Sequence, residues 1–289
     1  MSRILTTGIA TLDIINQVDH YPAEDEELRA EVQSIRCGGN AANTACVLAQ
    51  FGFEVHLLAT LGEDSAAEQI RRQLQANAVV TERLVTIPQG RTPTSYITLN
   101  RANASRTIIH YRDLPELEEN DFPFGELEDY DWFHFEGRNI DTLEKILRRL
   151  VRQRVDQPIS IEIEKPRPGI ERLYRYADLL LFSRAFAKSH DYTCADTLFD
   201  DLRSKGVSAT LVCSWAEQGA FACDRNGRRY HSPAFVPDQV VDTLGAGDTF
   251  HAGLIRAMLE GSSLETALHS ACELAGRKVA QYGLANLGT

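Results

Sequence analysis

The sequence predicts an α/β fold, in which a mainly parallel sheet is flanked by helices in three layers and a small antiparallel sheet lies beside it. Short, strongly apolar runs alternate along the chain with segments of helical length, which is the pattern of an α/β protein. Most of these runs are apolar at consecutive positions, as expected of strands buried on both faces of a parallel sheet. A chain of 289 residues without repeats or an obvious linker fits a single domain over residues 1–289.

The elements of the main layers follow in chain order. The apolar runs that we expect to be strands are residues 4–9, 54–61, 132–135, 159–163, 179–182 and 209–213. The segments with helical patterns are residues 65–76, 141–153, 169–176, 193–205, 246–259 and 264–282. Residues 221–230 carry Asn226-Gly227 at their centre, and this dipeptide is typical of a tight β-hairpin turn.

Three further segments do not follow the alternation of strand and helix. Residues 27–35 alternate in polarity and lead to a pair of glycines, and residues 94–99 and 106–111 have β-rich compositions. We expect these segments to form the small antiparallel sheet, set apart from the main one. We interpret the sheet as two insertions into one domain, at about residues 14–36 and 92–112.

The charge and the apolar pattern exclude several partners. The chain carries 30 basic and 41 acidic residues and has a net charge of −11, so we expect it to bind neither nucleic acid nor anionic membranes. The six cysteines form no C-x-x-C pair and no zinc pattern, and we interpret them as mostly buried free thiols. The N-terminus has no long apolar stretch, and no later run approaches the ~20 residues that cross a bilayer. We therefore expect a soluble, cytoplasmic protein.

Residues 240–250 form the most informative segment of the chain. Apolar residues lead into Gly245-Ala246-Gly247, which is followed by Asp248 and an amphipathic helix. Glycines let backbone N–H groups converge on one point, and the helix adds its positive N-terminal end, so the segment predicts an anion site suited to phosphate. It is not a dinucleotide fingerprint, because Phe250 stands where the third glycine would be.

Asp248 is unexpected in such a site because a carboxylate repels phosphate. It fits if it faces a hydroxyl that attacks the phosphorus, since it then orients that hydroxyl and accepts its proton. The alternative is an aspartate that only stabilises the N-terminus of the helix. Other catalytic patterns are missing: the chain has no G-x-x-x-x-G-K-[ST], H-E-x-x-H or G-x-S-x-G, and His134-Phe-Glu136 lacks the P-C-x-x-C of a zinc deaminase.

A second polar segment, residues 38–43 (GGNAAN), opens a helix near the N-terminus. Its glycines permit close approach of the backbone, and Asn40 and Asn43 offer paired donors and acceptors that suit a polyol. The alternative is a glycine turn with an asparagine cap. Asp13 follows an apolar run and Asp25 lies in a polar stretch; each is either an acceptor for sugar hydroxyls or a solvated loop acid.

Together, the two segments resemble the signature pair of the ribokinase-like (PfkB) carbohydrate kinases. The pair is Gly38-Gly39-Asn40-x-x-Asn43 and Asp242-Thr-x-Gly-Ala-Gly-Asp248. Segments that resemble the ketohexokinase branch of this family lie at residues 19–25, 105–108, 134–139, 162–167 and 215–219, and the likeness covers about residues 4–283. The resemblance implies an ATP-dependent sugar kinase that phosphorylates a ketohexose, foremost fructose to fructose 1-phosphate.

The resemblance also implies a role for each matching residue. The ketose would be held by Asp13, Gly39, Asn40, Asn43 and Asp248, with Asp25 supplied by the lid or by a partner subunit. ATP would be bound by Arg106, by Ala216, Glu217, Gln218 and Gly219, and by an anion hole of Gly245, Ala246 and Gly247. Asp248 would be the catalytic base. The small sheet would be a lid that clasps the lid of a second subunit, which implies a homodimer.

The implied cofactors are ATP and Mg²⁺, with K⁺ beside the anion hole as a further candidate, bound by the carbonyl groups of Asp242 and Leu244. The Asn-x-x-Glu motif that helps many members place magnesium is missing from residues 182–188, so the Mg²⁺ ligands stay unassigned. Glu162 and Glu164 are the substitutes that we consider, and we expect their alternation on a strand to let only one of them face a given side.

Other hypotheses stay open. The substrate would then be tagatose, a deoxy-keto sugar acid or a nucleoside, or the protein would be a catalytically silent sugar or nucleotide sensor. Arg36 is the nearby cation that a sugar acid needs, and Tyr96 and Tyr111 are the aromatic side chains that a nucleoside needs. Cys272 resembles an adenine-pocket position, and a buried structural thiol is the alternative.

Overall fold

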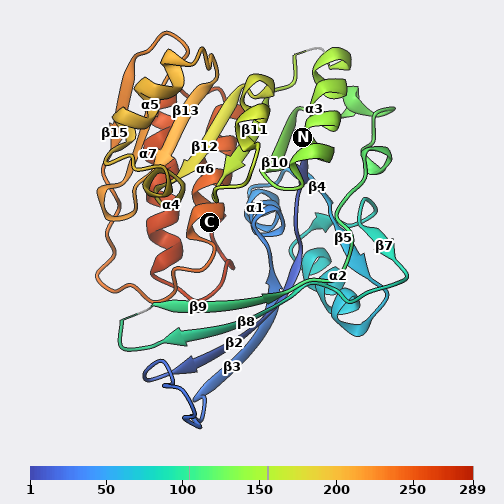
Figure 1. Ribbon diagram of the computed structural model, residues 1–289, viewed down its shortest axis with the longest axis vertical. Helices are drawn as coiled ribbons and strands as arrows, with labels where there is room; N and C mark the ends of the chain where they lie inside the picture. Colours follow the sequence, from blue (N-terminus) through green and yellow to red (C-terminus); the bar gives the residue numbers. More distant parts are fainter. Residues whose placement is uncertain (104, 155, 289) are drawn as a thin grey trace.

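The computed structural model describes residues 1–103, 105–154 and 156–288. They form a nine-stranded sheet with helices on both faces and a four-stranded sheet that lies across one end of the molecule (Figure 1). The strand order of the large sheet is β15-β14-β13-β12-β11-β10-β1-β4-β6. All neighbours from β13 to β6 pair in parallel, and β14 and β15 add an antiparallel hairpin at one edge. The predicted mainly parallel α/β sheet is confirmed.

The large sheet has short strands, as the apolar runs predict. They are β1 (Arg3–Thr7), β4 (Glu54–Leu58), β6 (Val79–Val80), β10 (Trp132–Glu136), β11 (Ile159–Ile163), β12 (Leu179–Ser183), β13 (Thr210–Ser214), β14 (Ala220–Cys223) and β15 (Arg229–Ser232). The predicted turn at Asn226-Gly227 joins the last two, and Gly227 has the positive φ of 86° that such a turn requires.

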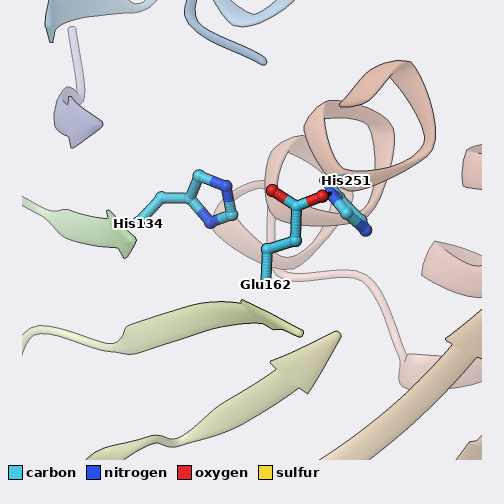
Figure 2. A group of neighbouring side chains, drawn as sticks. All are labelled: His134, Glu162 and His251. Carbon is cyan, nitrogen blue, oxygen red and sulfur yellow. Dashed lines mark ion pairs between the residues drawn. The ribbon is translucent and has the colours of Figure 1, made fainter. Parts of the chain in front are cut away.

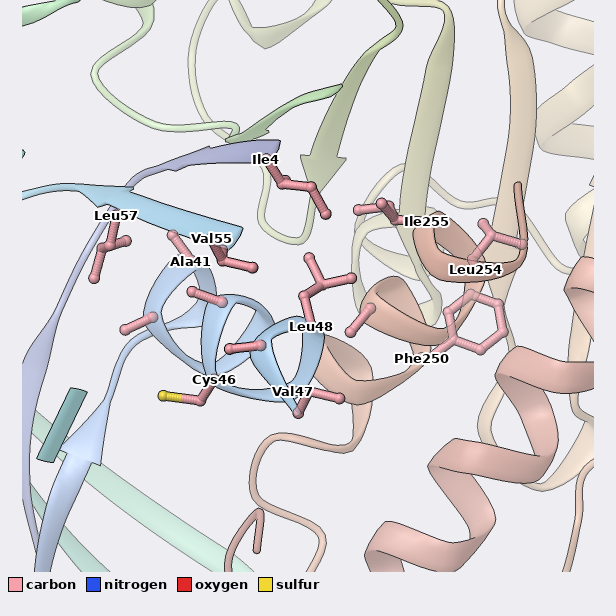
Figure 3. Packing of buried hydrophobic residues seen from close by; sticks show 14 of the residues in the cluster. Ile4, Ala41, Cys46, Val47, Leu48, Val55, Leu57, Phe250, Leu254 and Ile255 are labelled. Atoms are coloured by element: carbon pink, nitrogen blue, oxygen red, sulfur yellow. The ribbon is translucent and has the colours of Figure 1, made fainter. Parts of the chain in front are cut away.

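Helices cover the sheet on both sides. They are α1 (Asn40–Ala49), α2 (Ser65–Ala76), α3 (Ile140–Gln153), α4 (Arg184–Ser189), α5 (Ala195–Ser204), α6 (Ala246–Leu259) and α7 (Leu264–Val279), with short 3₁₀ helices at Glu119–Asp121, Leu127–Asp129, Ile170–Tyr176 and Ala216–Gln218. One apolar layer joins the sheet to α1, α2, α6 and α7, and the other joins it to α3, α4 and α5. Figure 3 shows the first layer, with Leu48 of α1 and Leu254 of α6 among its members.

The two faces of the central strands differ in character. On β10 and β11, Phe133 and Ile161 belong to the apolar layer under α3 and α5. The opposite face carries buried polar side chains, namely His134, Glu136, Ser160 and Glu162. Buried polar groups are costly unless they are hydrogen-bonded. This row of polar side chains under α1 and α6 is therefore where we look for a functional site.

The second sheet has the order β3 (Val32–Gly38), β2 (Thr11–Val18), β8 (Thr94–Asn100) and β9 (Arg106–Tyr111). Its two outer pairs are antiparallel, as predicted, and the middle pair, β2 with β8, is parallel. A parallel pair needs a long connection, and here the connection holds α1, β4 and α2. We call this sheet the lid sheet. β2 was not predicted, because its polar residues Asp13, Asn16 and Gln17 interrupt the apolar run.

Two further expectations differ from the structure. Residues 54–61 form two strands rather than one, because β5 (Thr60–Gly62) leaves the large sheet and pairs with β7 (Val85–Ile87). Residues 170–176 form a 3₁₀ helix rather than an α-helix. Within the described residues, none of the helices combines the length and the apolar character that a membrane span needs.

Candidate active site

Two helix N-termini meet beneath the lid sheet, and a glycine with positive φ caps each of them. Gly39 caps α1 with φ 96°, and Gly245 caps α6 with φ 76°. A Cβ atom on Gly39 would lie 2.4 Å from the Ile9 carbonyl oxygen, so backbone conformation and close approach both require glycine there. The two segments that the sequence singled out therefore face one another across a short distance.

Asp248 lies in the first turn of α6 and is 6% exposed. Its Oδ2 accepts a hydrogen bond of 2.7 Å from Nδ2 of Asn43 on α1. Burial raises the pKa of Asp248 to about 7; the charges of Glu164 and Glu136 act in the same direction, while the Asn43 hydrogen bond and Arg106 oppose them. A carboxyl group that titrates near neutral pH is suited to general-base catalysis.

The segment from Thr243 to Gly247, which we call the anion loop, leads into α6. The first N–H groups of a helix have no intrahelical acceptor and carry the positive end of its dipole. A Cβ atom added to Gly247 would meet no heavy atom within 4 Å, so open space lies beside these amides. Arg106 of β9 donates a hydrogen bond of 2.8 Å from Nη1 to Thr243 Oγ1. The features predicted for phosphate binding thus gather at one place.

A cavity of about 190 Å³ lies between α1, the lid sheet and the C-terminal segment. Asp13 and Asn43 line it, and its other lining residues are Arg36, Cys37, Cys46, Gln73, Asn77, Leu244, Gly283, Leu284 and Ala285. Drug-sized ligands usually occupy about 300–1,000 Å³, so this cavity suits a smaller molecule. Because Asn43 both lines the cavity and binds Asp248, the cavity and the candidate base are contiguous.

The Asp13 carboxylate is fixed at the cavity wall. Its Oδ1 accepts a hydrogen bond of 2.6 Å from Thr11 Oγ1, and burial raises its pKa. It also packs over Gly38, where a Cβ atom would lie only 1.9 Å from Asp13 Oδ2. Gly38 is therefore needed for the position of Asp13, which is a reason that the sequence alone does not show.

Asn40 is turned away from the cavity. Its Nδ2 donates to Glu162 Oε1 at 2.8 Å and to Glu164 Oε2 at 3.1 Å. The expectation that only one of these glutamates faces a given side is wrong, because side chains two residues apart on a strand point in the same direction. Burial and then the charges of Asp248, Glu136 and Glu164 raise the pKa of Glu162 well above its ordinary value.

A buried ion pair holds the anion loop from behind. The Asp242 carboxylate lies 2.9 Å from Arg36 Nη2 and 3.2 Å from Lys278 Nζ, and Lys278 Nζ also donates to the Asp242 carbonyl oxygen at 2.8 Å. Burial works against ionisation of Asp242, but the charges of Lys278 and Arg36 hold its pKa below the ordinary value. Sequence reasoning missed Lys278, whose only signal was a basic residue in the last turn of a helix, where cations are common.

The remaining predicted residues do not line the cavity. Ala216, Glu217 and Gln218 form an exposed 3₁₀ turn that follows β13 and leads to Gly219. Asp25 is exposed in the loop between β2 and β3 and does not line the cavity of its own chain.

The sulfur of Cys272 is buried, 3.9 Å from the carbonyl oxygen of Ser232. Five of the six cysteines are buried or half-buried free thiols, and Cys194 is exposed.

Comparisons with known proteins agree with this arrangement. Residues 1–288 match the pfkB family carbohydrate kinases. The chain is 38% identical to ketohexokinase of Mus musculus over 289 residues, which covers 97% of each protein. The fold is also that of a putative ribokinase from Agrobacterium tumefaciens, with a TM-score of 0.86 at 19% identity over 100% of this chain and 94% of that one. Arabidopsis thaliana ribokinase, complexed with ribose and ATP, gives a TM-score of 0.81 at 20% identity over 98% and 93%.

The chain therefore belongs to the pfkB family of carbohydrate kinases. It is an ATP-dependent sugar phosphotransferase, and among these relatives it resembles the mouse ketohexokinase at the level of sequence.

Replacing Gly38 by alanine should weaken sugar binding. The new Cβ atom would collide with Asp13 Oδ2 and displace the carboxylate by about 1 Å or more, and errors of that size cost up to about 10²-fold in an active site. Steady-state kinetics should show a raised KM for the sugar and little change in the KM for ATP. Gly125→Ala is the matched control, since a Cβ atom there meets nothing within 4 Å. Equal effects of both substitutions would contradict the assignment.

The pH profile should report Asp248. The base must be ionised to accept a proton, and burial raises its pKa to about 7, so the ionised fraction rises as the pH increases through that value. We expect kcat/KM, which reports the free enzyme, to increase from about pH 6 to about pH 8. A profile that is already flat from about pH 5 upward would show that Asp248 has an ordinary pKa or is not the base.

Proposed function

We propose that the protein transfers the terminal phosphoryl group of ATP to a ketohexose, converting fructose to fructose 1-phosphate. One observation carries the proposal: the Asp248 carboxylate, in the first turn of α6 beside the anion loop, is bonded to Asn43, which lines the cavity. A base, an anion site and a small polar cavity are the parts that phosphoryl transfer to an alcohol requires. The 38% identity to mouse ketohexokinase supports fructose as the substrate.

The mechanism follows from this arrangement. The amides of Gly245, Ala246 and Gly247 stabilise negative charge on the transferred group, and Arg106 adds a positive charge from the lid sheet. Asp248 orients the attacking hydroxyl and accepts its proton as the bond to phosphorus forms. Phosphoryl transfer depends mainly on alignment and charge neutralisation, and the first turn of α6 contributes to both through its amides and Asp248. Closure of the lid sheet excludes water as a competing acceptor.

Substrate contacts divide between the two sides of the site. We assign the ketose to Asp13 and Asn43, which line the cavity. Gly39 and Asn40 do not line it, and we keep them as ketose contacts because they begin the same helix as Asn43. Asp25 would be supplied from a partner's lid. We assign the nucleotide to the exposed turn at Ala216, Glu217, Gln218 and Gly219. Arg36 lines the cavity but is paired with Asp242, which favours a neutral sugar over a sugar acid. A cytoplasmic location stays a prediction from the sequence.

We propose Mg²⁺ as the metal that accompanies ATP, since it neutralises phosphate charge. Glu164 is the residue best placed to assist it, because its carboxylate is half-exposed and lies close to Asn40, and Mg²⁺ prefers oxygen ligands. K⁺ would use the Asp242 and Leu244 carbonyl oxygens. Lys278 Nζ already donates to the first of these at 2.8 Å, so the ammonium group supplies part of the charge that K⁺ would bring.

We propose a homodimer through the lid sheet. Asp13 lines the cavity, so its neighbour Ile14 points to the other face of the sheet. The register places Ile35, Tyr96 and Ile109 in the same row as Ile14, and these three side chains are 42%, 51% and 66% exposed. An uncovered apolar row of this kind suits the same row of a second copy.

Asp248→Asn should abolish turnover while sugar binding is kept. The amide is nearly isosteric with the carboxylate and its oxygen still accepts from Asn43, but it cannot take a proton, and loss of a general base costs about 10²–10⁴-fold. ADP release with fructose, compared with tagatose, aldoses and nucleosides, measures activity, and calorimetry measures fructose binding. Asp238→Asn, at an exposed position, is the control. Turnover near the wild-type rate in Asp248→Asn would refute the assignment of the base, and a clear preference for another acceptor would refute fructose.

Two experiments test the dimer. Ile109→Asp places a charge in the exposed row and should convert the dimer to a monomer in sedimentation experiments. If Asp25 acts in the partner's site, then co-expression of Asp25→Asn with Asp248→Asn should restore activity that neither variant has alone, because one site of the mixed dimer keeps both carboxylates. Glu24→Gln, at the neighbouring exposed position, should leave activity unchanged. A wild-type monomer, or mixed dimers without activity, would contradict the proposal.

A further inference from the structure

Three buried side chains that the phosphoryl transfer does not use converge between β10, β11 and α6. They are His134, Glu162 and His251, which are 0%, 3% and 5% exposed. Each offers one ligand atom, and these atoms all lie within 4.8 Å of one another. Figure 2 shows the Glu162 carboxylate between the two imidazole rings, with one ring on the strand side and the other on α6.

Each of these side chains has a buried polar atom without a hydrogen-bond partner. The atoms are His134 Nε2, Glu162 Oε2 and His251 Nδ1. A buried polar atom left without a partner costs about 1–3 kcal/mol, and native structures contain few of them. Three such atoms, directed at one small region, indicate one shared partner that the polypeptide itself does not provide.

The other ends of two of these side chains are firmly held. His134 Nδ1 lies 2.9 Å from Ser160 Oγ, which also accepts from Trp132 Nε1 at 2.8 Å. Glu162 Oε1 accepts from Asn40 Nδ2 at 2.8 Å. Metal-binding imidazoles and carboxylates are usually oriented by such contacts at the atom that does not bind the metal. The arrangement therefore fixes which atoms remain for a shared ligand.

The chemistry of the three atoms selects the kind of partner. A neutral imidazole has one ring nitrogen without a proton, and the lone pair of that nitrogen can bind a cation. Two imidazole nitrogens and one carboxylate oxygen suit zinc and its transition-metal neighbours, whereas Mg²⁺ and Ca²⁺ prefer oxygen. The three ligand atoms lie within 4.8 Å of one another, and small side-chain rotations bring them to the spacing of about 3.4 Å that two ligands have around zinc at bonds of 2.0–2.1 Å.

We propose that His134, Glu162 and His251 form a zinc site that is separate from the magnesium bound with ATP. The site gives the three unpartnered atoms a shared partner and ties α6 to β10 and β11. It is linked to the sugar side because Glu162 also holds Asn40, and His251 follows Asp248 by three positions on α6. Zinc bound there fixes the position of α6 against the sheet, and a water molecule takes the fourth position that the three side chains leave open.

The site is tested with the full chain, prepared without a histidine tag. After removal of metals with a strong chelator, Zn²⁺ is titrated and bound metal is measured by mass spectrometry. We expect saturable uptake of about one zinc per chain, a rise in the thermal unfolding midpoint on zinc addition, and no displacement by excess Mg²⁺. Co²⁺ used as a spectroscopic probe should give the visible bands of a low-coordinate nitrogen and oxygen site.

Substitutions of the ligands separate this site from incidental binding. His251→Asn and His134→Gln should each lose stoichiometric zinc and the cobalt bands. His269→Gln, at an exposed position of α7, should keep both, and circular dichroism checks the fold of every variant. Should the wild-type chain take up no zinc saturably, or should both ligand variants bind as much as the wild type, the proposal is overturned, and a bridging water is then the shared partner of the three atoms.

Discussion

The hydrogen bond between Asn43 and Asp248 is the contact on which the site depends. It joins the first turns of two helices that come from opposite ends of the chain, and its length is 2.7 Å. Beneath it, α1 and α6 share one apolar layer (Figure 3), so the distance between the helices is set by packing. Protein interiors are too closely packed to allow that spacing to drift. Asn43 at the cavity and Asp248 beside the anion loop are thereby kept at a fixed distance from one another.

Acidic side chains are concentrated here in a protein that already has a net charge of −11. After burial, neighbouring carboxylate charges help to raise the pKa values of Glu136, Glu162 and Asp248, and Arg138 contacts Glu136 at 3.1 Å. On the far side of the anion loop, Lys278 and Arg36 offset Asp242. Carboxylates thus gather around Asn40 and Asn43, and cations lie on the Asp242 side of the anion loop. Burial is the main cause of the raised pKa of Asp248, and the charges of Glu164 and Glu136 add to it.

The sequence predicts best those structural features that are determined by one residue or one short segment. Gly39 and Gly245 were identified because a backbone turn imposes its demand on a single residue, and the apolar strands because burial on two faces shows directly in composition. The pairing of Lys278 with Asp242 and the meeting of His134 with His251 were missed, since 36 and 117 positions separate the partners. Nothing in the local pattern shows such contacts. Asp25 does not line the cavity of its own chain, and this too is not visible in the local pattern.

The lid sheet is joined to α1 through a single residue, Gly39. Strand β3 ends at Gly38, and α1 begins two residues later at Asn40, while Asp13 and Arg106 belong to strands of the same sheet. A tilt of that sheet would move Asp13 and Arg106 together. In the mechanism that we propose, contacts with the sugar and with ATP would therefore form in the same motion, and a water molecule, which is too small to reach both residues, would not stabilise the tilted position.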